Sequence, residues 1–383
     1  MTHELSPATF EQAASGLAQA SAEGQTVRIR GAGTKLAWGR PVPEPDVELR
    51  TGDLNEIVEH NVGDLTAILQ AGVPLRQAQA RFAAESQMLA LDPPSSAGVP
   101  ATGEATIGGV IATADCGPLR HRYGSPRDLV VGMTVALSDG TIARSGGKVI
   151  KNVAGYDLAK LFAGSFGTLG VILSVSVRLH PLPIDTATVL GASADADVLA
   201  RASGVLAAAP LELEALDVAW RGGRGGMLAR CGGADAVRRA QRIALLMGES
   251  GLEQIDVVTD DADLWARQRA GQRSPTRALV RITAPPSSLA NVLRAATSCD
   301  GTLVGRAALG ASFVELDPEA VPRLRAGLPA GAGSMLLDAP ETARAAACPW
   351  GESEPCALAL MKRVKARFDP AGACNPGVFV GGI

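Results

Sequence analysis

The segment from Gly147 to Ile172 constrains the fold more than any other part of the chain. It combines closely spaced glycines with polar side chains. The glycines are Gly155, Gly164, Gly167 and Gly170, and the polar residues are Lys148, Lys151, Asn152, Tyr156 and Asp157. Glycines at this density let a backbone turn sharply and approach a bulky ligand closely. The segment is therefore either a glycine-rich connection in an ordinary sheet or a turn that binds a cofactor.

Regular structure is predicted inside this segment and after it. Asp157 can cap a short helix over residues 158–163, which Gly164 then ends. From Val171 to Leu179, apolar residues alternate with polar ones, a pattern that predicts a half-buried strand. Pro181 ends that strand. The glycine segment therefore leads directly into a sheet.

A second glycine-rich turn lies near the N-terminus. After a helix predicted from Ser6 to Gly24, residues 27–30 have the pattern of a strand that runs into Gly31–Lys35. Two glycines in a turn expose successive backbone N–H groups, which suit a phosphate or pyrophosphate. A dinucleotide motif of the form G-x-G-x-x-G does not fit, because Leu36 stands at its third glycine and prolines follow. If a phosphate binds here, we expect it to bind a strand-to-turn segment without the help of a helix dipole. A plain tight turn that binds no ligand also explains these residues.

A small α/β unit is predicted between the two turns. Residues 64–70 have a strand pattern, and Pro74 begins a predicted helix. A third glycine cluster follows at residues 102–109. Residues 131–137 and 141–143 then flank an Asp-Gly turn, which predicts a hairpin that delivers the chain to Gly147.

Length and composition describe a globular protein of more than one domain. The chain has 383 residues, of which 46% are hydrophobic, and a formal net charge of −3. This charge, with no basic block, argues against nucleic acid as the partner. We expect a cytoplasmic chain with reduced thiols, because neither a signal peptide nor an apolar run of about 18 residues is present. The six scattered cysteines form no C-x-x-C motif, so no metal or iron–sulfur site is predicted.

The middle of the chain has a different pattern from the N-terminal half. From residue 187 to about residue 360 it is rich in alanine, and short apolar strands such as 278–282 and 312–316 alternate with helical stretches. This pattern predicts an α+β domain with an antiparallel sheet. A basic helix over residues 357–368 then returns the chain to the first domain.

The three glycine clusters together resemble a known family. They occur in the order found in the FAD-binding domain of the vanillyl-alcohol oxidase and D-lactate dehydrogenase flavoproteins. The resemblance is carried by Arg30–Thr34, Thr106–Gly109, Arg122–Gly124 with Asp128, and Gly155–Gly170. Residues 368–377 are similar to the ending of the glycolate oxidase branch of that family. Within the branch, residues 151–157 and the short chain most resemble the FAD-binding subunits of bacterial glycolate oxidases.

The resemblance implies an α+β fold, with a two-part FAD-binding domain of the vanillyl-alcohol oxidase type and an α+β cap domain. The implied divisions are residues 1–182 for FAD binding, 183–365 for the cap, and 366–383 for a segment that returns to the FAD-binding domain. The implied FAD-binding residues are Arg30, Gly31, Ala32, Gly33, Thr34, Lys35, Thr106, Ile107, Gly108, Gly109, Lys148, Asn152, Tyr156, Gly170, Val171 and Ile172. Noncovalent FAD is expected, because no histidine lies between His3 and His60.

The histidines mark a departure from the family. Its catalytic members carry histidines and an acidic residue in the C-terminal half, whereas no histidine follows His180 here. An imidazole base and a metal cluster are therefore missing from the predicted cap, and no catalytic residue is assigned. His121 stands between two arginines, which fits a solvated loop histidine better than one that faces the flavin.

Three functions stay open at this point. The first is an FAD-binding subunit of a glycolate oxidase complex, with a catalytic flavin subunit and an iron–sulfur subunit as partners. That complex would oxidise a small 2-hydroxy acid and pass electrons to a membrane acceptor, which would hold the chain at the inner face of the membrane. The second is a self-sufficient FAD-dependent 2-hydroxy-acid dehydrogenase. The third is a flavin-fold scaffold without turnover.

Overall fold

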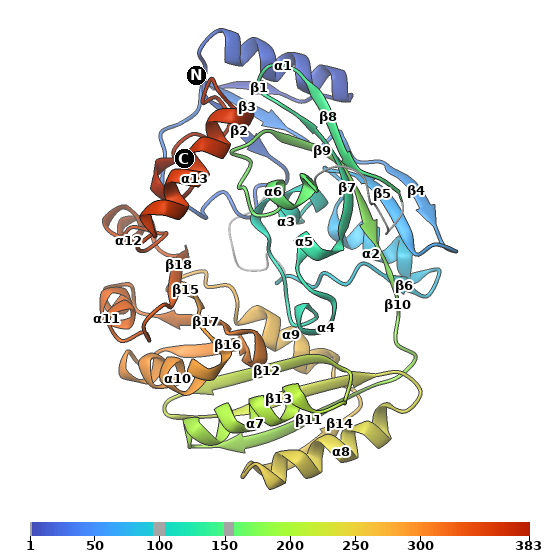
Figure 1. Ribbon diagram of the computed structural model, residues 1–383, viewed down its shortest axis with the longest axis vertical. Coiled ribbons are helices and arrows are strands. Elements are labelled where there is room, and N and C mark those ends of the chain that lie inside the picture. Colours follow the sequence, from blue (N-terminus) through green and yellow to red (C-terminus); the bar gives the residue numbers. More distant parts are fainter. Residues whose placement is uncertain (1, 95–103, 149–156) are drawn as a thin grey trace.

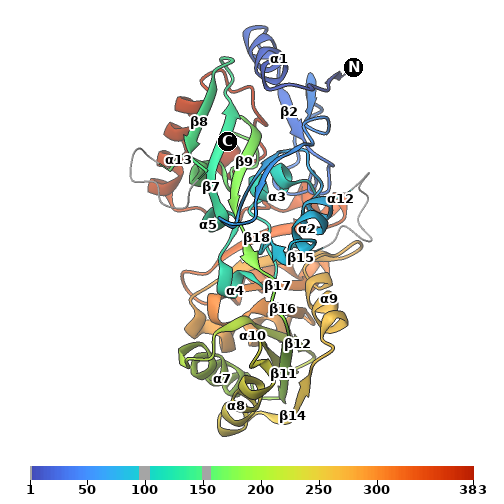
Figure 2. The same ribbon diagram turned by 90° about the vertical axis from the view of Figure 1, so that its right-hand side faces the viewer.

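The structure is a computed structural model that describes residues 2–94, 104–148 and 157–383. Two regions are visible in Figure 1. One is built from the N-terminal 180 residues and the C-terminal helix α13, and the other is a large sheet with its own helices. A view from the side shows the same division (Figure 2). No helix in the described ranges is long and apolar enough to cross a membrane.

A small parallel sheet begins the first region. Its order is β1 (His3–Leu5), β3 (Val47–Arg50) and β2 (Val27–Arg30), and helix α1 (Phe10–Ala22) packs against it. The helix begins after the predicted Ser6 because the Thr9 hydroxyl accepts a hydrogen bond from the Gln12 N–H at 3.2 Å and so caps the first turn.

A five-stranded antiparallel sheet forms the centre of the first region. Its strands, in spatial order, are β4 (Ile57–Asn61), β5 (Thr66–Gln70), β9 (Val171–Arg178), β7 (Val130–Ala136) and β8 (Ile142–Gly146). The hairpin predicted over 131–143 is present as β7 and β8. The first part of β9 is buried on both faces, because α1 and the small sheet cover Leu173 while helices cover the other face. At its end the predicted alternation holds, since Ser176 is half-buried and Arg178 is exposed.

Short helices cover the second face of this sheet and connect its strands. They are α2 (Leu75–Ala83), α3 (Ile107–Thr113), α5 (Pro126–Leu129) and α6 (Ala159–Phe162), and a short ladder joins β6 (Gln87–Met88) to β10 (His180–Pro181). Helix α4 (Arg120–Tyr123) instead faces the second region, where the Tyr123 hydroxyl donates to Glu214 at 3.1 Å. The predicted cap of α6 was wrong. Asp157 makes an ion pair with Lys160 at 2.9 Å, and the Leu158 N–H at the start of the helix donates to the Ser145 hydroxyl at 3.0 Å instead.

The second region is one antiparallel sheet of eight strands, here named the cap sheet. In spatial order they are β14 (Glu253–Val258), β11 (Thr186–Ser193), β13 (Arg224–Gly232), β12 (Leu213–Arg221), β16 (Thr302–Arg306), β17 (Ala311–Leu316), β15 (Ala278–Thr283) and β18 (Gly333–Asp338). Helices α7 (Ala196–Ala208), α8 (Ala236–Glu249), α10 (Leu289–Ser298) and α11 (Val321–Ala326) pack on one face. Helix α9 (Ala262–Ala270) packs on the other, with Trp265 buried beside Ala215 and Leu228.

The C-terminal segment returns to the first region, as expected. Helix α12 (Glu341–Ala346) and helix α13 (Pro355–Phe368) lead back, and the predicted boundary at residue 365 falls inside α13. Residues 373–375 then pair with β2. The Val27 N–H donates to the Ala373 carbonyl and the Asn375 N–H donates to the Val27 carbonyl, each at 2.8 Å. The end of the chain thus lies beside the first glycine turn.

Candidate cofactor site

One cavity of about 710 Å³ lies where the two regions meet. Four stretches of the first region line it: residues 26–45 around the first glycine turn, residues 106–113 at the start of α3, residues 166–172 before β9, and residues 375–378. Residues 274–275 and 338–344 complete it from the cap-sheet side. A volume of this size is typical of small-molecule and cofactor sites.

Most of the predicted FAD-binding residues line this cavity. They are Arg30, Gly31, Ala32, Gly33, Thr34, Lys35, Thr106, Gly108, Gly109, Gly170 and Ile172. The three glycine clusters are therefore brought to one place, although about 140 residues separate the first from the last.

The remaining predicted residues lie elsewhere or outside the described ranges. Ile107 is buried in the core beneath α3, and Val171 packs on the α1 side of β9. Lys148 pairs with Glu59 on β4 and does not line the cavity. Asn152 and Tyr156 fall in the segment that is not described.

The first glycine turn leaves its amide donors free. No acceptor within the described residues takes a hydrogen bond from the backbone N–H groups of Gly31 to Lys35. Gly33 has φ of +79°, a left-handed conformation that glycine adopts without strain. A Cβ on Gly31 would stand 2.3 Å from the Thr106 hydroxyl, so only glycine lets this turn approach α3. Free donors in such a turn suit an anionic group.

The start of α3 contributes space rather than free donors. Its first N–H groups are already used, since Gly108 donates to the Ala71 carbonyl at 2.8 Å and Gly109 donates to the Thr106 hydroxyl at 3.3 Å. No helix follows the first turn, in agreement with the prolines that follow it in the sequence. The anion-binding capacity of the cavity therefore comes mainly from residues 31–35.

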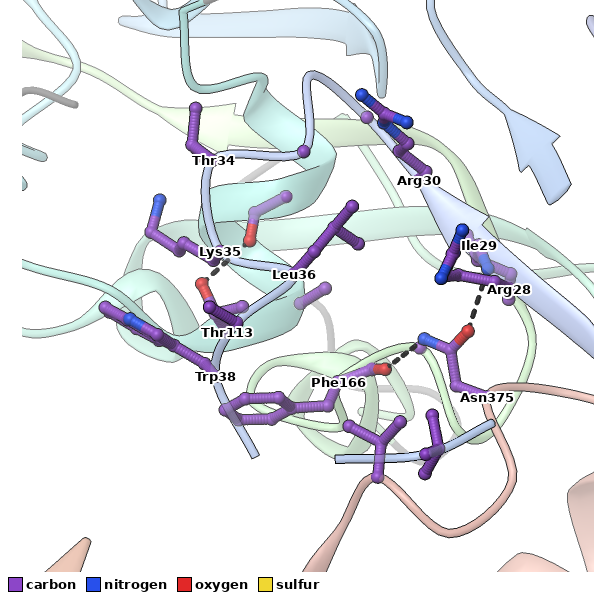
Figure 3. Close-up of a pocket in the computed structure, with 18 of the residues that line it drawn as sticks. Arg28, Ile29, Arg30, Thr34, Lys35, Leu36, Trp38, Thr113, Phe166 and Asn375 are labelled. Carbon is purple, nitrogen blue, oxygen red and sulfur yellow. Dashed lines mark hydrogen bonds between the residues drawn. The ribbon is translucent and has the colours of Figure 1, made fainter. Parts of the chain in front are cut away.

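Asn375 is a cavity residue that was not predicted. Its Oδ1 accepts from the Ile29 N–H at 2.8 Å, and its Nδ2 donates to the Phe166 carbonyl at 2.6 Å (Figure 3). It thereby fastens β2, which leads into the first turn, to the loop before β9. Asn375 lies in the stretch 368–377 that resembles the glycolate oxidase branch, but no local pattern there predicts that its side chain reaches the cavity.

Buried charges fasten the first turn to its surroundings. The Lys35 Nζ lies 3.2 Å from Asp115 Oδ2, and both side chains are buried. From the cap-sheet side, the Arg273 Nη2 donates to the Thr34 carbonyl at 3.3 Å, and its Nε donates to Asp338 at 3.0 Å. Trp38 also donates to Asp338, at 3.0 Å. The turn is thus held by the cap sheet as well as by its own region.

Further charges are buried where the cap sheet faces the first region. Arg306 and Asp217 are 2% and 0% exposed and form an ion pair. Asp92 lies nearby, 3.9 Å from the Arg269 guanidinium, and accepts a hydrogen bond from the Leu119 N–H at 3.1 Å. Burial raises the pKa of Asp92 to about 7, although Arg306 and Arg269 act in the opposite direction.

The histidines lie away from the cavity. All four are in the described ranges, and none of them lines it. His121 lies in α4, half-buried, and burial lowers its pKa, so the expectation of a solvated loop histidine was wrong. His180 packs against Tyr123 with ring centroids 4.6 Å apart, and burial lowers its pKa to about 4. In the described ranges no group of three or more His, Cys, Asp or Glu could hold a metal.

Family models match both ends of the chain. The model described as FAD binding domain matches residues 3–146, and the model described as FAD linked oxidases, C-terminal domain, matches residues 351–379. The chain therefore carries an FAD-binding domain. FAD is therefore its cofactor, and the cavity with its free amide donors fits the anionic pyrophosphate of that group.

Proteins of similar sequence are named as FAD-linked oxidoreductases or as glycolate oxidase subunits. An uncharacterized FAD-linked oxidoreductase of Mycobacterium tuberculosis is 27% identical over 98% of this chain and 90% of its own length. Glycolate oxidase subunit GlcE of Escherichia coli is 36% identical over 43% of this chain and 45% of its own length. Subunit GlcD of Bacillus subtilis is 40% identical over 49% and 39%. These last two matches each span less than half of the relative.

A solved structure confirms the predicted fold class. An alkyldihydroxyacetonephosphate synthase superposes with a TM-score of 0.70 over 97% of this chain and 76% of its own, at 14% identity. The α+β fold with a vanillyl-alcohol-oxidase-type FAD-binding domain and a cap is thus confirmed. At this identity the likeness concerns the fold alone.

Proposed function

We propose that this chain is the FAD-binding subunit of a multi-subunit oxidase of glycolate or a related 2-hydroxy acid. A catalytic flavin subunit and an iron–sulfur subunit would be its partners, and the electrons would pass to a membrane acceptor. The names of similar proteins support this choice, since glycolate oxidase subunits and a D-lactate dehydrogenase are among them. The observation that carries it is a contrast: the cofactor cavity has free donors, whereas no imidazole stands at it.

The first glycine turn has the central role in holding FAD in this proposal. The backbone N–H groups of Gly31 to Lys35 would donate to the pyrophosphate, and Gly108 and Gly109 would leave room for the ribityl chain beside them. The Asn375 side chain holds β2 and the Phe166 loop at a fixed separation. When bound, FAD accepts a hydride from a substrate and passes electrons onward. We expect it to be held noncovalently.

The residues beside the cavity are less suited to act on a hydroxy acid. A base that takes the hydroxyl proton typically contributes about 10²- to 10⁴-fold to the rate. The cationic side chains Lys35, Arg273 and Arg306 each already face a buried carboxylate. A chain built this way can hold the cofactor while a partner subunit supplies the base.

A glycine substitution tests the cofactor part of the proposal. Gly33→Val places a β-branched side chain in the left-handed region, which costs about 1–2 kcal/mol, and sets its Cβ 2.9 Å from the Arg30 Nε. We expect the purified variant to lose its flavin absorbance. Gly52→Val is the matched control, because no atom lies within 4 Å of its Cβ and its φ is not positive. If Gly33→Val retains FAD as the control does, the turn does not hold the pyrophosphate.

Acid precipitation tests how the cofactor is attached. Yellow flavin is expected in the supernatant after the wild-type chain is precipitated. Colour that stays in the pellet would show a covalent bond and contradict the noncovalent assignment.

Anaerobic reduction tests the division of labour. The isolated chain with FAD bound should show little flavin bleaching on addition of glycolate or D-lactate. Co-expression with both partner subunits should give membrane-linked oxidation that is lost when this chain is left out. Rapid bleaching of the isolated chain, matched by formation of the 2-oxo acid, would refute the subunit role.

A self-sufficient dehydrogenase is the second candidate, and Asp92 is the observation that favours it. A carboxyl with a pKa of about 7 can accept a proton near neutral pH, and it lies among the arginines at the face of the cap sheet. On this alternative, Asp92→Asn would abolish bleaching of the isolated chain while leaving its FAD content unchanged.

A further inference from the structure

Helix α13 is exposed to an unusual degree. Its 14 residues include no buried residue, whereas every other described helix of eight or more residues has at least two. It lies at the outer edge of the molecule in both views (Figures 1 and 2). Leu360 is 57% exposed and Met361 is 41% exposed. An amphipathic helix that covers a core normally buries its apolar stripe, so this helix has an uncovered side.

The uncovered side combines an apolar part with cations. Cys356, Leu360, Arg363 and Arg367 follow each other at intervals of four, three and four residues, which places them on one helix face. The small residues Ala359 and Ala366 lie next to this stripe and are exposed. The helix contains no acidic residue. The side chains of Lys362, Arg363 and Arg367 form no ion pair with any residue that the structure describes.

The inner side of α13 is fastened to the cofactor region. The Lys365 Nζ donates to the Thr168 carbonyl at 2.7 Å and to the Cys374 carbonyl at 2.8 Å. Phe368 packs edge-on against Phe162, with ring centroids 5.7 Å apart. The helix is therefore firmly placed by its C-terminal half, and its exposed stripe is not the result of a loose segment.

We propose that the exposed stripe of α13 is the docking surface for a partner protein, which presents an amphipathic helix with acidic side chains. Arginine is enriched in protein interfaces, and the unpaired cations call for carboxylates opposite them. Small side chains at positions 359 and 366 let the backbone of a second helix come close. A membrane surface fits less well, because interfacial helices use several large apolar anchors and this stripe has only one, Leu360.

This inference deepens the proposed function and rests on it, since the partner would be a subunit of the oxidase complex. Lys365 contacts the carbonyls of Thr168 and Cys374, next to the residues that line the cavity. A partner seated on α13 would therefore stand beside the part of the cofactor site that Asn375 lines.

A charge-reversal pair tests the docking surface. The tagged chain is co-expressed with the catalytic flavin and iron–sulfur subunits of a glycolate oxidase, and captured partner is measured relative to bound FAD. Leu360→Glu with Arg363→Glu should lower partner recovery at least about tenfold while FAD content and thermal stability stay unchanged. Leu245→Glu with Arg242→Glu is the matched control on α8, with the same spacing and similar exposure. Leu360→Ala with Arg363→Ala serves as a milder variant if the charged one folds poorly.

The other outcomes separate the two proposals. Equal recovery by the α13 variant and the wild-type chain overturns the docking surface alone. Failure of the wild-type chain to recover either partner overturns the complex membership and the docking role together. Self-association of the wild-type chain that the α13 variant abolishes would assign the stripe to a second copy. Binding to phosphatidylglycerol vesicles with the same sensitivity would assign it to lipid, and either result overturns a protein partner.

Discussion

The two faces of the cap sheet come from the same strands but are built in opposite ways. On the face under α7, α8 and α10, β12 presents Leu216, Val218 and Trp220 to one apolar core. On the face toward the FAD-binding region, the alternate position is Asp217, which pairs with Arg306 of β16. Arg281 of β15 and Phe313 of β17 lie on that same face. Neighbouring residues in one strand thus have entirely different surroundings.

The two faces of the cap sheet therefore contribute to the structure in different ways. An apolar core is held by burial and tolerates changes that keep volume. A buried ion pair stabilises only while both partners are present, and it fixes how two surfaces are matched. We therefore expect substitutions on the two faces to separate general stability from the joining of the cap sheet to the cofactor region.

The largest effect is expected when one partner of the buried pair is removed. Asp217→Leu leaves the Arg306 guanidinium buried without its carboxylate and should lower the free energy of unfolding by about 3–5 kcal/mol. Urea unfolding of the FAD-bound chain measures it. Asp217→Leu with Arg306→Met should recover most of the loss, since replacing both partners is often neutral. If the double variant is as unstable as the single one, the unpaired Arg306 charge is not the cause of the lost stability.

A smaller effect is expected one residue away. Val218→Ala removes methyl groups from the core on the opposite face and should cost about 2 kcal/mol from lost burial and the cavity that remains. The same urea experiment measures it, and no second substitution near the FAD-binding region should restore it. Rescue by a change on the charged face would mean that the two faces are coupled.

The smallest effect is expected from pH. The folded pKa of Asp92 lies above its unfolded value near 3.8, so the folded chain binds the proton more tightly. That stabilisation is complete at low pH and is lost as pH rises through about 7. Between pH 6 and pH 8 the free energy of unfolding should fall by about 1 kcal/mol through this group. Asp92→Asn should flatten the profile in that interval, and an unchanged slope would remove Asp92 as its source.

Much of the fold could be predicted from local patterns. Strand alternation, the Asp-Gly hairpin and the glycine clusters are local signals, and they led to a fold class and cofactor that the comparisons confirm. The prediction for β9 holds at the end of the strand and was wrong at its beginning. Alternation predicts one buried face, but whether the other face is also covered depends on α1 and the small sheet, which the strand itself does not encode.

The contacts that complete the site could not be predicted in this way. The Arg273 side chain reaches the Thr34 carbonyl across 239 residues of sequence, and Trp38 reaches Asp338 across 300. Nothing local to either partner indicates such a contact. An arginine near residue 273 has the same pattern as a solvated surface cation, and only the meeting of the two regions gives it a carboxylate.

Asn375 has a consequence for how the chain is made. Its side chain binds Ile29 across 346 residues, and residues 373–375 supply the neighbour of β2. During synthesis β2 is therefore present from the beginning with an unpaired edge, which is open to wrong pairing until the last part of the chain arrives. A chain truncated before residue 373 has every strand of both large sheets but lacks the Asn375 bonds that fasten β2 to the loop before β9. The cavity therefore gains its last lining residues only when residues 375–378 have been made.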